Sequence, residues 1–571
     1  MNLGGRQIFA SGGRPACAHD HLVGLVLCAL YITLLWHTAG DIGLSRDEGI
    51  YVDAANNYAS WFELLAHDRP TALTRSASDH FFHVNHEHPP LAKMLFALGH
   101  LAQEKWQIFP TESLSYRFGG MLSAGLLLWL IYIFGTRLYG PTAGLFAALA
   151  YALLPRPFYH AHLDAFDVPI TCAVTCVTYA YYRSLSDWRW APISGVVFGL
   201  ALLTKHNSWI LPGIFALHFV WLAATELYAR KRGHAAAVSL VPWGLYAMAV
   251  LGPPIFLGGW PWLWHDTALR LQEYAAFHMH HEYYNMEYFG VNYFWPPFPV
   301  SYPWVMTLFT VPLTTLWLAL AGLGHELGQW WRQLRVLLTR ASADALAQPP
   351  IDRTQTLVLL LGCCLAPMVI ISLPSTPIFG GTKHWFPAYP FFALFAGRTF
   401  QLTCELAKPR LSGLSAALRC SFAPVFGALL LLPSAVETAH SHPFGLSHYT
   451  AAAGGVPGAA DHGMNRQFWG FTTRSLVPFF KQAMPQGGSV YICDTIWTSW
   501  QMLSRDGFLP SNIVASFDIA EADYAIVHHE KHFIEVDEQI WTTYGSVKPV
   551  YVLRYDGVPI ISVYKNPHSR R

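Results

Sequence analysis

The sequence predicts a polytopic α-helical membrane protein that carries a small soluble α/β domain at its C-terminal end. The chain of 571 residues is 53% hydrophobic and only 12% charged, whereas soluble domains usually carry about 25% charged residues. About eleven apolar stretches approach the roughly 20 residues that a membrane-spanning helix needs. After residue 440 these stretches stop, and short runs of β-branched and aromatic residues take their place.

The candidate spans follow one another from the N-terminal end, and the fifth of them is short. They lie at residues 22–40, 118–136, 141–158, 166–182, 191–204, 209–226, 237–258, 304–323, 356–374, 386–402 and 421–437. The first has no small-residue cleavage site after it, so we expect an uncleaved span rather than a signal peptide. The nine cysteines show no CxxC spacing, which indicates neither a disulfide framework nor a cysteine-based zinc site. The net charge of +1 argues against nucleic acid as a partner.

The positive-inside rule predicts a cytoplasmic N-terminus. With that orientation, alternate short loops that hold the Lys and Arg clusters, such as "RKR" at 230–232, all lie inside. The loops 41–117, 155–167, 259–304 and 374–385 then lie on the extracytoplasmic face. We therefore predict a multi-pass protein of the cell (inner) membrane. Its residues 1–440 form a transmembrane domain, and those four loops form one composite site.

The segment 441–571 is predicted to be a soluble α/β domain on the same extracytoplasmic face. Its strand-like runs are "GGSVYICD", "SNIVASFD", "ADYAIVHH" and "PVYVLRYDGVPIISVYK", which are punctuated by Gly, Pro and Asp.

Two extracytoplasmic motifs carry residues that suit chemistry. Adjacent acids, Asp47 and Glu48, follow the first span in "LSRDEG". Acids at this position can also be ordinary helix caps at the interface. The second motif, "HVNHEHPPLAKMLFALGH", runs from a histidine-rich loop into Pro-Pro and a helix start, with Lys93 in the first turns. A lysine at a helix N-terminus near headgroup depth is a good phosphate ligand.

These motifs, in order, resemble glycosyltransferase family 39, the protein O-mannosyltransferase-like group of the GT-C class. The resemblance rests on "RDE", "HPPLAKML", "YRFGG", "HAHLDAFDVPIT", "GLALLTKHNSW" and "KHWFPAYPFFALFAG", and it continues into "HPFGLSHYTAAAGGVPGA". It implies a GT-C-like fold and a membrane glycosyltransferase whose donor is a polyprenyl-phosphate-linked sugar. The acceptor stays open between a protein, a glycolipid and a polysaccharide, because loop 259–304 is too short for the β-trefoil of the eukaryotic mannosyltransferases.

The resemblance also implies residue roles. Asp47 matches the proposed general base on the acceptor, Glu48 is its neighbour in the motif, and Asp167 matches the second acid better than the nearby Asp164 does. Lys93 and Arg117 are the implied phosphate contacts, although Ala92 stands where the family usually has glycine. The remaining candidates near these motifs are Arg46 and His88.

The expected chemistry agrees with these roles. A departing phosphate needs cations, here Lys93, Arg117, Lys205 and Lys383, and a carboxylate within about 3 Å must take the acceptor proton. A single displacement would invert the anomeric centre. Lys383 and His384 share a narrow turn, which favours a functional role, whereas Lys205 and His206 could equally be interfacial residues that snorkel.

No cofactor is expected to be required. The cluster from His278 to Glu282 could bind a divalent metal such as zinc, but adjacent histidines among aromatics more often form a surface loop, so we assign no metal. The alternative functions are a transporter or flippase of a polyprenyl-linked substrate, and a scaffold that binds partners through its tail. The concentration of polar motifs on one side favours chemistry at the lipid surface.

Overall fold

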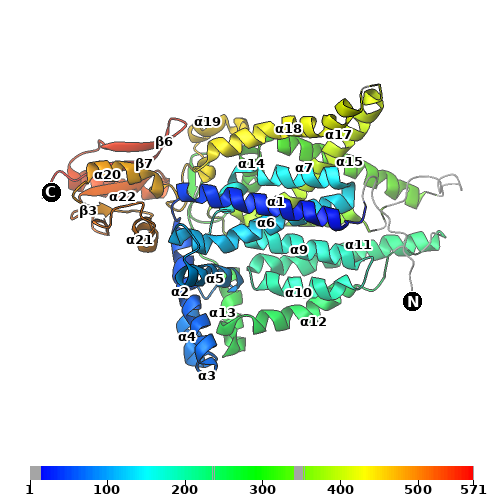
Figure 1. Ribbon diagram of the computed structural model, residues 1–571, viewed down its shortest axis with the longest axis horizontal. Coiled ribbons are helices and arrows are strands. Elements are labelled where there is room, and N and C mark those ends of the chain that lie inside the picture. Colours follow the sequence, from blue (N-terminus) through cyan, green and yellow to red (C-terminus); the bar gives the residue numbers. More distant parts are fainter. Residues whose placement is uncertain are drawn as a thin grey trace.

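The computed structural model describes residues 14–569 apart from 234, 235, 237, 340–351, 353 and 414. It is mostly helical and ends in a mixed β-sheet. Long helices run side by side through the larger part of the molecule, helices α2 and α4 lie across one end of them, and the C-terminal sheet lies beyond that end (Figure 1).

The helices of the larger part differ in length, and several are interrupted. They are α1 Ala18–Thr38, α2 Arg46–His67, α3 Arg69–Ala72, α4 Arg75–Phe82, α5 Leu91–Trp106, α6 Glu112–Tyr139, α7 Pro141–Ala152, α8 Pro155–His160, α9 Asp167–Ser184, α10 Trp190–Leu202, α11 Leu211–Lys231, α12 Trp243–Gly258, α13 Thr267–Met279, α14 Tyr302–Thr310, α15 Leu313–Leu338, α16 Thr356–Ile371, α17 Tyr389–Leu411 and α18 Ala416–Ser441. A short hairpin, β1 Met286–Tyr288 with β2 Val291–Tyr293, lies between α13 and α14.

Four helical segments are long and apolar enough to cross a bilayer, judged by length and composition. They are Ala18–Asp41, Glu112–Tyr139, His206–Lys231 and Ala416–Ser441, and four shorter apolar helices accompany them in the described part of the chain. All eleven predicted stretches fall largely on helices. Two are broken, since 141–158 is divided between α7 and α8 and 304–323 between α14 and α15. Both breaks lie at prolines, since Pro155 is the first residue of α8 and Pro312 immediately precedes α15. Proline lacks a backbone N–H and is unfavourable inside a helix, although α12, α16, α17 and α18 each contain at least one. The number eleven stays a prediction.

The C-terminal part folds into a five-stranded sheet flanked by helices. Its elements are α19 Gly455–Asp461, α20 Val477–Ala483, β3 Gly488–Tyr491, α21 Trp497–Arg505, β4 Ile513–Ser516, β5 Tyr524–His528, α22 Ile534–Tyr544, β6 Tyr551–Tyr555 and β7 Val558–Lys565. The strand order is β4-β3-β5-β7-β6. Strand β3 pairs in parallel with β4 and β5, whereas β7 is antiparallel to both its neighbours. Asp556 and Gly557 make the β6–β7 turn with positive φ, as a two-residue hairpin turn requires.

A buried ion pair joins the start of α2 to α6. Arg117 donates to Glu48 through Nε at 2.8 Å and Nη2 at 3.2 Å, and both side chains are essentially inaccessible to solvent. The same guanidinium donates to the carbonyls of Ile42 and Gly43 at 2.9 and 2.8 Å. Glu48 also accepts from the backbone N–H of Ser45 at the first turn of α2. The pair thus fixes the turn between α1 and α2. Arg46 and Asp47, which immediately precede Glu48 in α2, project from the end of this turn.

The C-terminal unit contacts the same two helices. Ser499 donates to the carbonyl of Ser45 at 3.0 Å, and Thr498 lies 3.0 Å from the carboxylate of Asp53 on α2. Asp506 accepts from the backbone N–H of Ser113 at the start of α6. The sheet is therefore attached where the buried ion pair anchors α2.

We predict that Arg117→Met lowers the stability of the folded protein sharply. It leaves the Glu48 carboxylate buried without a partner, which costs about 3–5 kcal/mol. Thermal unfolding of the detergent-solubilised protein should show a midpoint lower by several degrees. The matched control is Arg75→Ala, whose exposed pairs with Asp79 and Asp266 contribute at most about 1 kcal/mol each. Equal midpoints for the two variants would contradict the assigned structural role.

Candidate active site

A cavity of about 910 Å³ lies where α9, α11 and α16 meet the C-terminal unit. Its wall toward the helix bundle is apolar and includes Val174, Leu211, Ile214, Pro367 and Ile370. Polar residues of other segments line it as well. They are Arg46, Asp47, Asn85, Glu87, His88, Lys205, His206, His278, His281, Lys383, His384, Asn465, Asp494, Glu530 and His532.

Seven of the twelve residues predicted from the sequence line this cavity, although their segments are far apart in the chain. They are Arg46, Asp47, His88, Lys205, His206, Lys383 and His384. The other five, Glu48, Lys93, Arg117, Asp164 and Asp167, lie behind its wall, and all five are buried.

Asp47 is the predicted acid that remains accessible, with 24% of its side chain exposed. Its Oδ2 lies 3.2 Å from Lys383 Nζ, and its Oδ1 lies 3.8 Å from Arg46 Nε. Arg46 in turn donates to Asp494 of the C-terminal unit at 2.7 Å. The result is an alternating chain of two acids and two cations along the polar lining. Asp47 therefore has a cation on each side and an open face toward the cavity.

Asp167 is buried behind the cavity wall and pairs with Lys205, a cation that lines the cavity. Lys205 donates to its Oδ1 at 2.9 Å, and His160 Nδ1 lies 3.2 Å from its Oδ2. Since Asp167 is only 6% exposed, it acts on the cavity through Lys205. This arrangement differs from that of Asp47, which reaches the cavity itself.

Two glycines allow the segment "GGTKHW" to turn tightly beside Lys383. Gly380 and Gly381 have φ of +68° and +71°, a backbone conformation that other residues rarely adopt. A Cβ on Gly380 would lie 2.1 Å from the Trp469 ring. The turn brings Lys383 Nζ over that ring, 4.1 Å from its centroid. His384 Nε2 is occupied by the backbone of Phe379, and burial followed by the charge of Lys383 lowers its pKa to about 3.

The structure corrects the expected positions of Glu48, Arg117 and Asp164. Burial alone would raise the pKa of Glu48, but the Arg117 guanidinium outweighs it and lowers that pKa. Burial, and then the Glu48 carboxylate, raise the pKa of Asp164 well above its usual value. The backbone N–H of Asp164 lies 3.4 Å from Glu48. Glu48 and Arg117 satisfy each other away from the cavity, whereas both carboxyl oxygens of Asp164 are buried without a hydrogen-bond partner. We interpret the Glu48–Arg117 pair as structural.

Lys93 also differs from its expected position as a phosphate ligand. Its Nζ donates to the carbonyls of Asn85 and His88 at 2.6 and 3.0 Å, and the side chain is fully buried between the rings of Tyr58 and Phe166. Burial lowers the pKa of the ammonium to about 7. Lys93 therefore clamps the loop 85–88, and that loop lines the cavity.

The cavity is also lined by two acids of the C-terminal unit, which the sequence analysis did not identify. Asp494 follows strand β3 and Glu530 follows strand β5, which is parallel to β3 and adjacent to it. Burial raises the pKa of Asp494 to about 6, although Arg46 opposes the rise. Burial and the nearby Asp494 raise the pKa of Glu530 well above its usual value. The carboxyl ends of adjacent parallel strands are a common place for ligand-binding side chains, and that rule could have identified both residues.

The histidines of the segment 278–282, to which the sequence analysis assigns no metal, do not converge on one point. His280 Nδ1 lies 3.3 Å from the carbonyl of Ala276, and His281 stacks on Phe379 with ring centroids 4.9 Å apart. His278 instead points to the cavity, toward two histidines of other segments.

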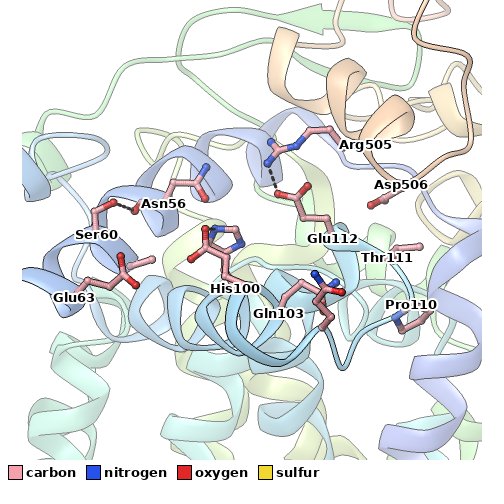
Figure 2. Close-up of a pocket in the computed structure, with 13 residues that line it drawn as sticks. Asn56, Ser60, Glu63, His100, Gln103, Pro110, Thr111, Glu112, Arg505 and Asp506 are labelled. Carbon is pink, nitrogen blue, oxygen red and sulfur yellow. Dashed lines mark hydrogen bonds and ion pairs between the residues drawn. The ribbon is translucent and has the colours of Figure 1, made fainter. Parts of the chain in front are cut away.

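A second pocket, of about 650 Å³, lies between α2, α5, the start of α6 and α21. Figure 2 shows Arg505 of α21 paired with Glu112 of α6 across it. Its lining is strongly polar and includes Asn56, Glu63, His100, Gln103 and Asp506. None of the residues predicted from the sequence lies in this pocket.

Residues 87–253 match the family model described as dolichyl-phosphate-mannose-protein mannosyltransferase. The protein is a multi-pass membrane glycosyltransferase that uses a polyprenyl-phosphate-linked sugar donor. The resemblance to glycosyltransferase family 39 that the motifs predict is thereby confirmed over this part of the chain. The match favours the transferase over the transporter and scaffold alternatives. A comparison with curated proteins finds no match.

Solved structures with a similar arrangement share little sequence with the chain. ArnT from Cupriavidus metallidurans bound to undecaprenyl phosphate is 15% identical, and the alignment covers 97% of this chain and 100% of ArnT with a TM-score of 0.45. The Archaeoglobus fulgidus oligosaccharyltransferase tethered with an acceptor peptide is 11% identical. That alignment covers 93% of this chain and 71% of the oligosaccharyltransferase, again with a TM-score of 0.45.

We expect Lys93→Ala to loosen the loop 85–88. The carbonyls of Asn85 and His88 lose their donor, and an unsatisfied buried polar group costs about 1–3 kcal/mol. Hydrogen exchange followed by mass spectrometry should show faster exchange in peptides covering 83–90. Lys105→Ala, at the exposed end of the same helix α5, should leave that exchange unchanged. Unchanged exchange in Lys93→Ala together with loss of phosphate binding would restore the role of direct phosphate ligand.

The raised pKa of Asp494 predicts a specific pH dependence of stability. Between about pH 4 and pH 6 the folded state binds more protons at this site than the unfolded state does. The contribution of Asp494 to the free energy of unfolding therefore falls as pH rises through that window, and it is constant above it. We expect the difference in unfolding midpoint between wild type and Asp494→Asn to shrink from pH 4 to pH 6. Parallel curves for the two proteins would exclude the raised pKa.

Proposed function

We propose that the enzyme transfers its sugar to an acceptor hydroxyl in a single displacement inside the 910 Å³ cavity, with Asp47 as the general base. The observation that carries the proposal is the mixed lining of this cavity. Apolar side chains of α9, α11 and α16 suit a prenyl chain, and Lys205 and Lys383 offer cations for a phosphate. A polyprenyl phosphate sugar likewise has an apolar and a charged end.

We assign the cavity to the extracytoplasmic face. It lies at the N-terminal end of α11, whereas the basic residues Arg230 and Lys231 lie at the opposite end of that helix. The positive-inside rule favours a cytoplasmic position for such a basic end. The cavity and the basic residues thus lie at opposite ends of α11, which supports the extracytoplasmic assignment.

Lys383 and Lys205 are the proposed ligands of the donor phosphate. Each is held by a carboxylate, Asp47 or Asp167, so each ammonium is oriented before the donor arrives. Cations placed in advance where negative charge develops stabilise the departing phosphate. The Trp469 ring beside Lys383 and the neighbouring Phe468 offer apolar faces for the sugar.

The contact between Asp47 and Lys383 links binding to chemistry. When the donor phosphate takes over the ammonium of Lys383, the Asp47 carboxylate loses one partner and becomes free to accept a proton. The acceptor oxygen then forms a bond to the anomeric carbon as its proton passes to Asp47. The bond between that carbon and the phosphate oxygen breaks, and the electron pair leaves with polyprenyl phosphate. The anomeric configuration is inverted.

The test is Asp47→Asn, assayed in nanodiscs with a panel of radiolabelled polyprenyl-phosphate sugars. Loss of general-base assistance should reduce kcat by about 10²–10⁴-fold, while donor affinity stays within a few-fold because the two lysines remain. Glu63→Gln is the control, since Glu63 lies on the same helix and is exposed outside the cavity. Equal turnover of wild type and Asp47→Asn would remove Asp47 from the base role. A product with retained anomeric configuration would exclude the single displacement.

A further inference from the structure

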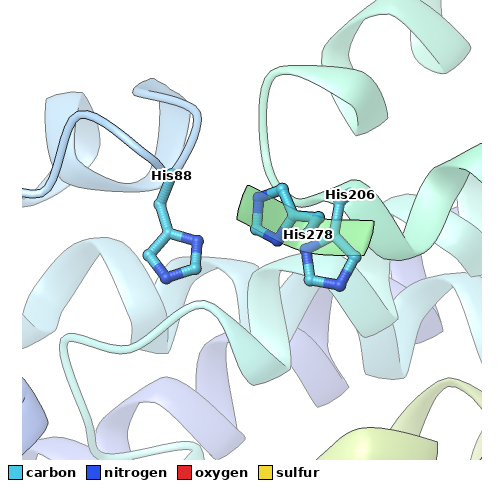
Figure 3. A group of neighbouring side chains, drawn as sticks. All are labelled: His88, His206 and His278. Atoms are coloured by element: carbon cyan, nitrogen blue, oxygen red, sulfur yellow. The ribbon is translucent and has the colours of Figure 1, made fainter. Parts of the chain in front are cut away.

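Three histidines from distant segments meet on one wall of the cavity. His88 comes from the loop before α5, His206 from the short 3₁₀ helix His206–Ile210 that precedes α11, and His278 from the last turn of α13. One ring nitrogen from each lies within 4.8 Å of the others. Figure 3 shows the stacked rings of His206 and His278 facing His88. The ring centroids are 3.9 Å apart within the stack and 5.4 Å apart between His88 and His278.

The hydrogen bonding of these rings is incomplete in a specific way. The Nδ1 atoms of His88, His206 and His278 are all buried and have no hydrogen-bond partner. Buried polar atoms are normally paired, so three orphaned nitrogens in one place need an explanation. His278 Nε2 lies 3.0 Å from the backbone carbonyl of Glu87, to which it must donate. Its Nδ1 therefore carries the free lone pair, and this is how metal-ligating histidines are usually oriented.

Packing against aromatic rings explains only part of this arrangement. His278 contacts the rings of Trp209, Tyr274 and Phe277, which accounts for its place at the end of α13. Those contacts are made by ring faces and edges, and they leave the nitrogen lone pairs unused.

The neighbouring charges do not oppose a bound cation strongly. Lys205 precedes His206 in the chain, but its ammonium is 2.9 Å from Asp167 and is neutralised there. The Glu87 carboxylate also lines the cavity, on the loop that carries His88.

We propose that His88, His206 and His278 form a site for a divalent transition metal of the zinc class. Three imidazoles with a fourth position left open are a common zinc arrangement. Because all three side chains line the cavity, that open position is available to water or to a phosphate oxygen. Tetrahedral ligands at 2.0–2.1 Å from zinc are about 3.4 Å apart, and the three nitrogens already lie within 4.8 Å of one another, so the rings need to close by at most about 1.4 Å when the metal binds.

The site differs from the local segment 278–282, which the sequence analysis considered as a metal site and to which it assigned no metal. Only His278 belongs to both, and the remaining ligands come from the motifs "HEHPP" and "TKHN". Metal binding would thereby tie together the loop 85–88, the start of α11 and the end of α13. The proposal is independent of the role given to Asp47.

The experiment is cobalt binding to the full chain in detergent after removal of metals with a chelator. Wild type should bind one Co²⁺ per chain, with an absorption band in the visible region that added Zn²⁺ abolishes. His88→Ala and His206→Ala should each weaken binding more than about 100-fold, since loss of a mere outer-shell partner already costs 10–100-fold. His280→Ala, an exposed histidine beside the site, should bind like wild type.

A second measurement needs no variant. X-ray absorption of the zinc-loaded wild type should show three imidazole nitrogens at about 2.0–2.1 Å. This guards against variants that simply fail to fold. The proposal is overturned if wild type binds no Co²⁺, if both alanine variants bind like wild type, or if the zinc spectrum shows fewer than three imidazoles. None of these readouts depends on sugar transfer, so failure here leaves the proposed reaction untouched.

Discussion

The buried contact between Glu48 and Arg117 places almost everything else in the site. It neutralises a carboxylate with no access to water, closes the turn between α1 and α2, and anchors the first turn of α2 on α6. The preceding residues, Arg46 and Asp47, are left pointing into the cavity. The two adjacent acids of this motif therefore have different roles. Glu48 is buried and holds the backbone through Arg117, and the same contact leaves Asp47 accessible from the cavity.

Sequence patterns predicted the elements of the fold better than their interruptions. Apolar stretches predict the helices because a membrane-spanning helix needs predominantly apolar side chains. Runs of β-branched residues predict the strands of the C-terminal sheet. The break between α7 and α8 and the break before α15 depend on single prolines within apolar stretches. Hydropathy alone does not distinguish these prolines from those that α12, α16, α17 and α18 accommodate within a continuous helix.

The chemistry of the candidate site was predictable only in part. Motif reading found Asp47, Lys205 and Lys383, which line the cavity, but it could not separate them from Lys93 and Arg117. A cation that binds phosphate and one that caps backbone carbonyls look alike in a sequence, and burial alone distinguishes them. Asp494 and Glu530 lie about 450 and 480 residues beyond Asp47 in sequence, at strand ends, and only the docking of the sheet brings them to the cavity. The predicted division at residue 440 therefore does not separate the site from the C-terminal unit.

The apolar wall of the cavity has a consequence for how the enzyme meets its donor. In the proposed function, the prenyl chain lies against the apolar side chains of α11 and α16 that line the cavity, and the donor is drawn from the lipid phase. The relevant concentration is then the mole fraction of donor in the bilayer or micelle, not its amount per volume of buffer. Adding detergent dilutes such a donor even when the volume stays constant. Apparent Michaelis constants measured at different detergent concentrations would therefore depend on the mole fraction of donor in the micelle as well as on the affinity of the protein.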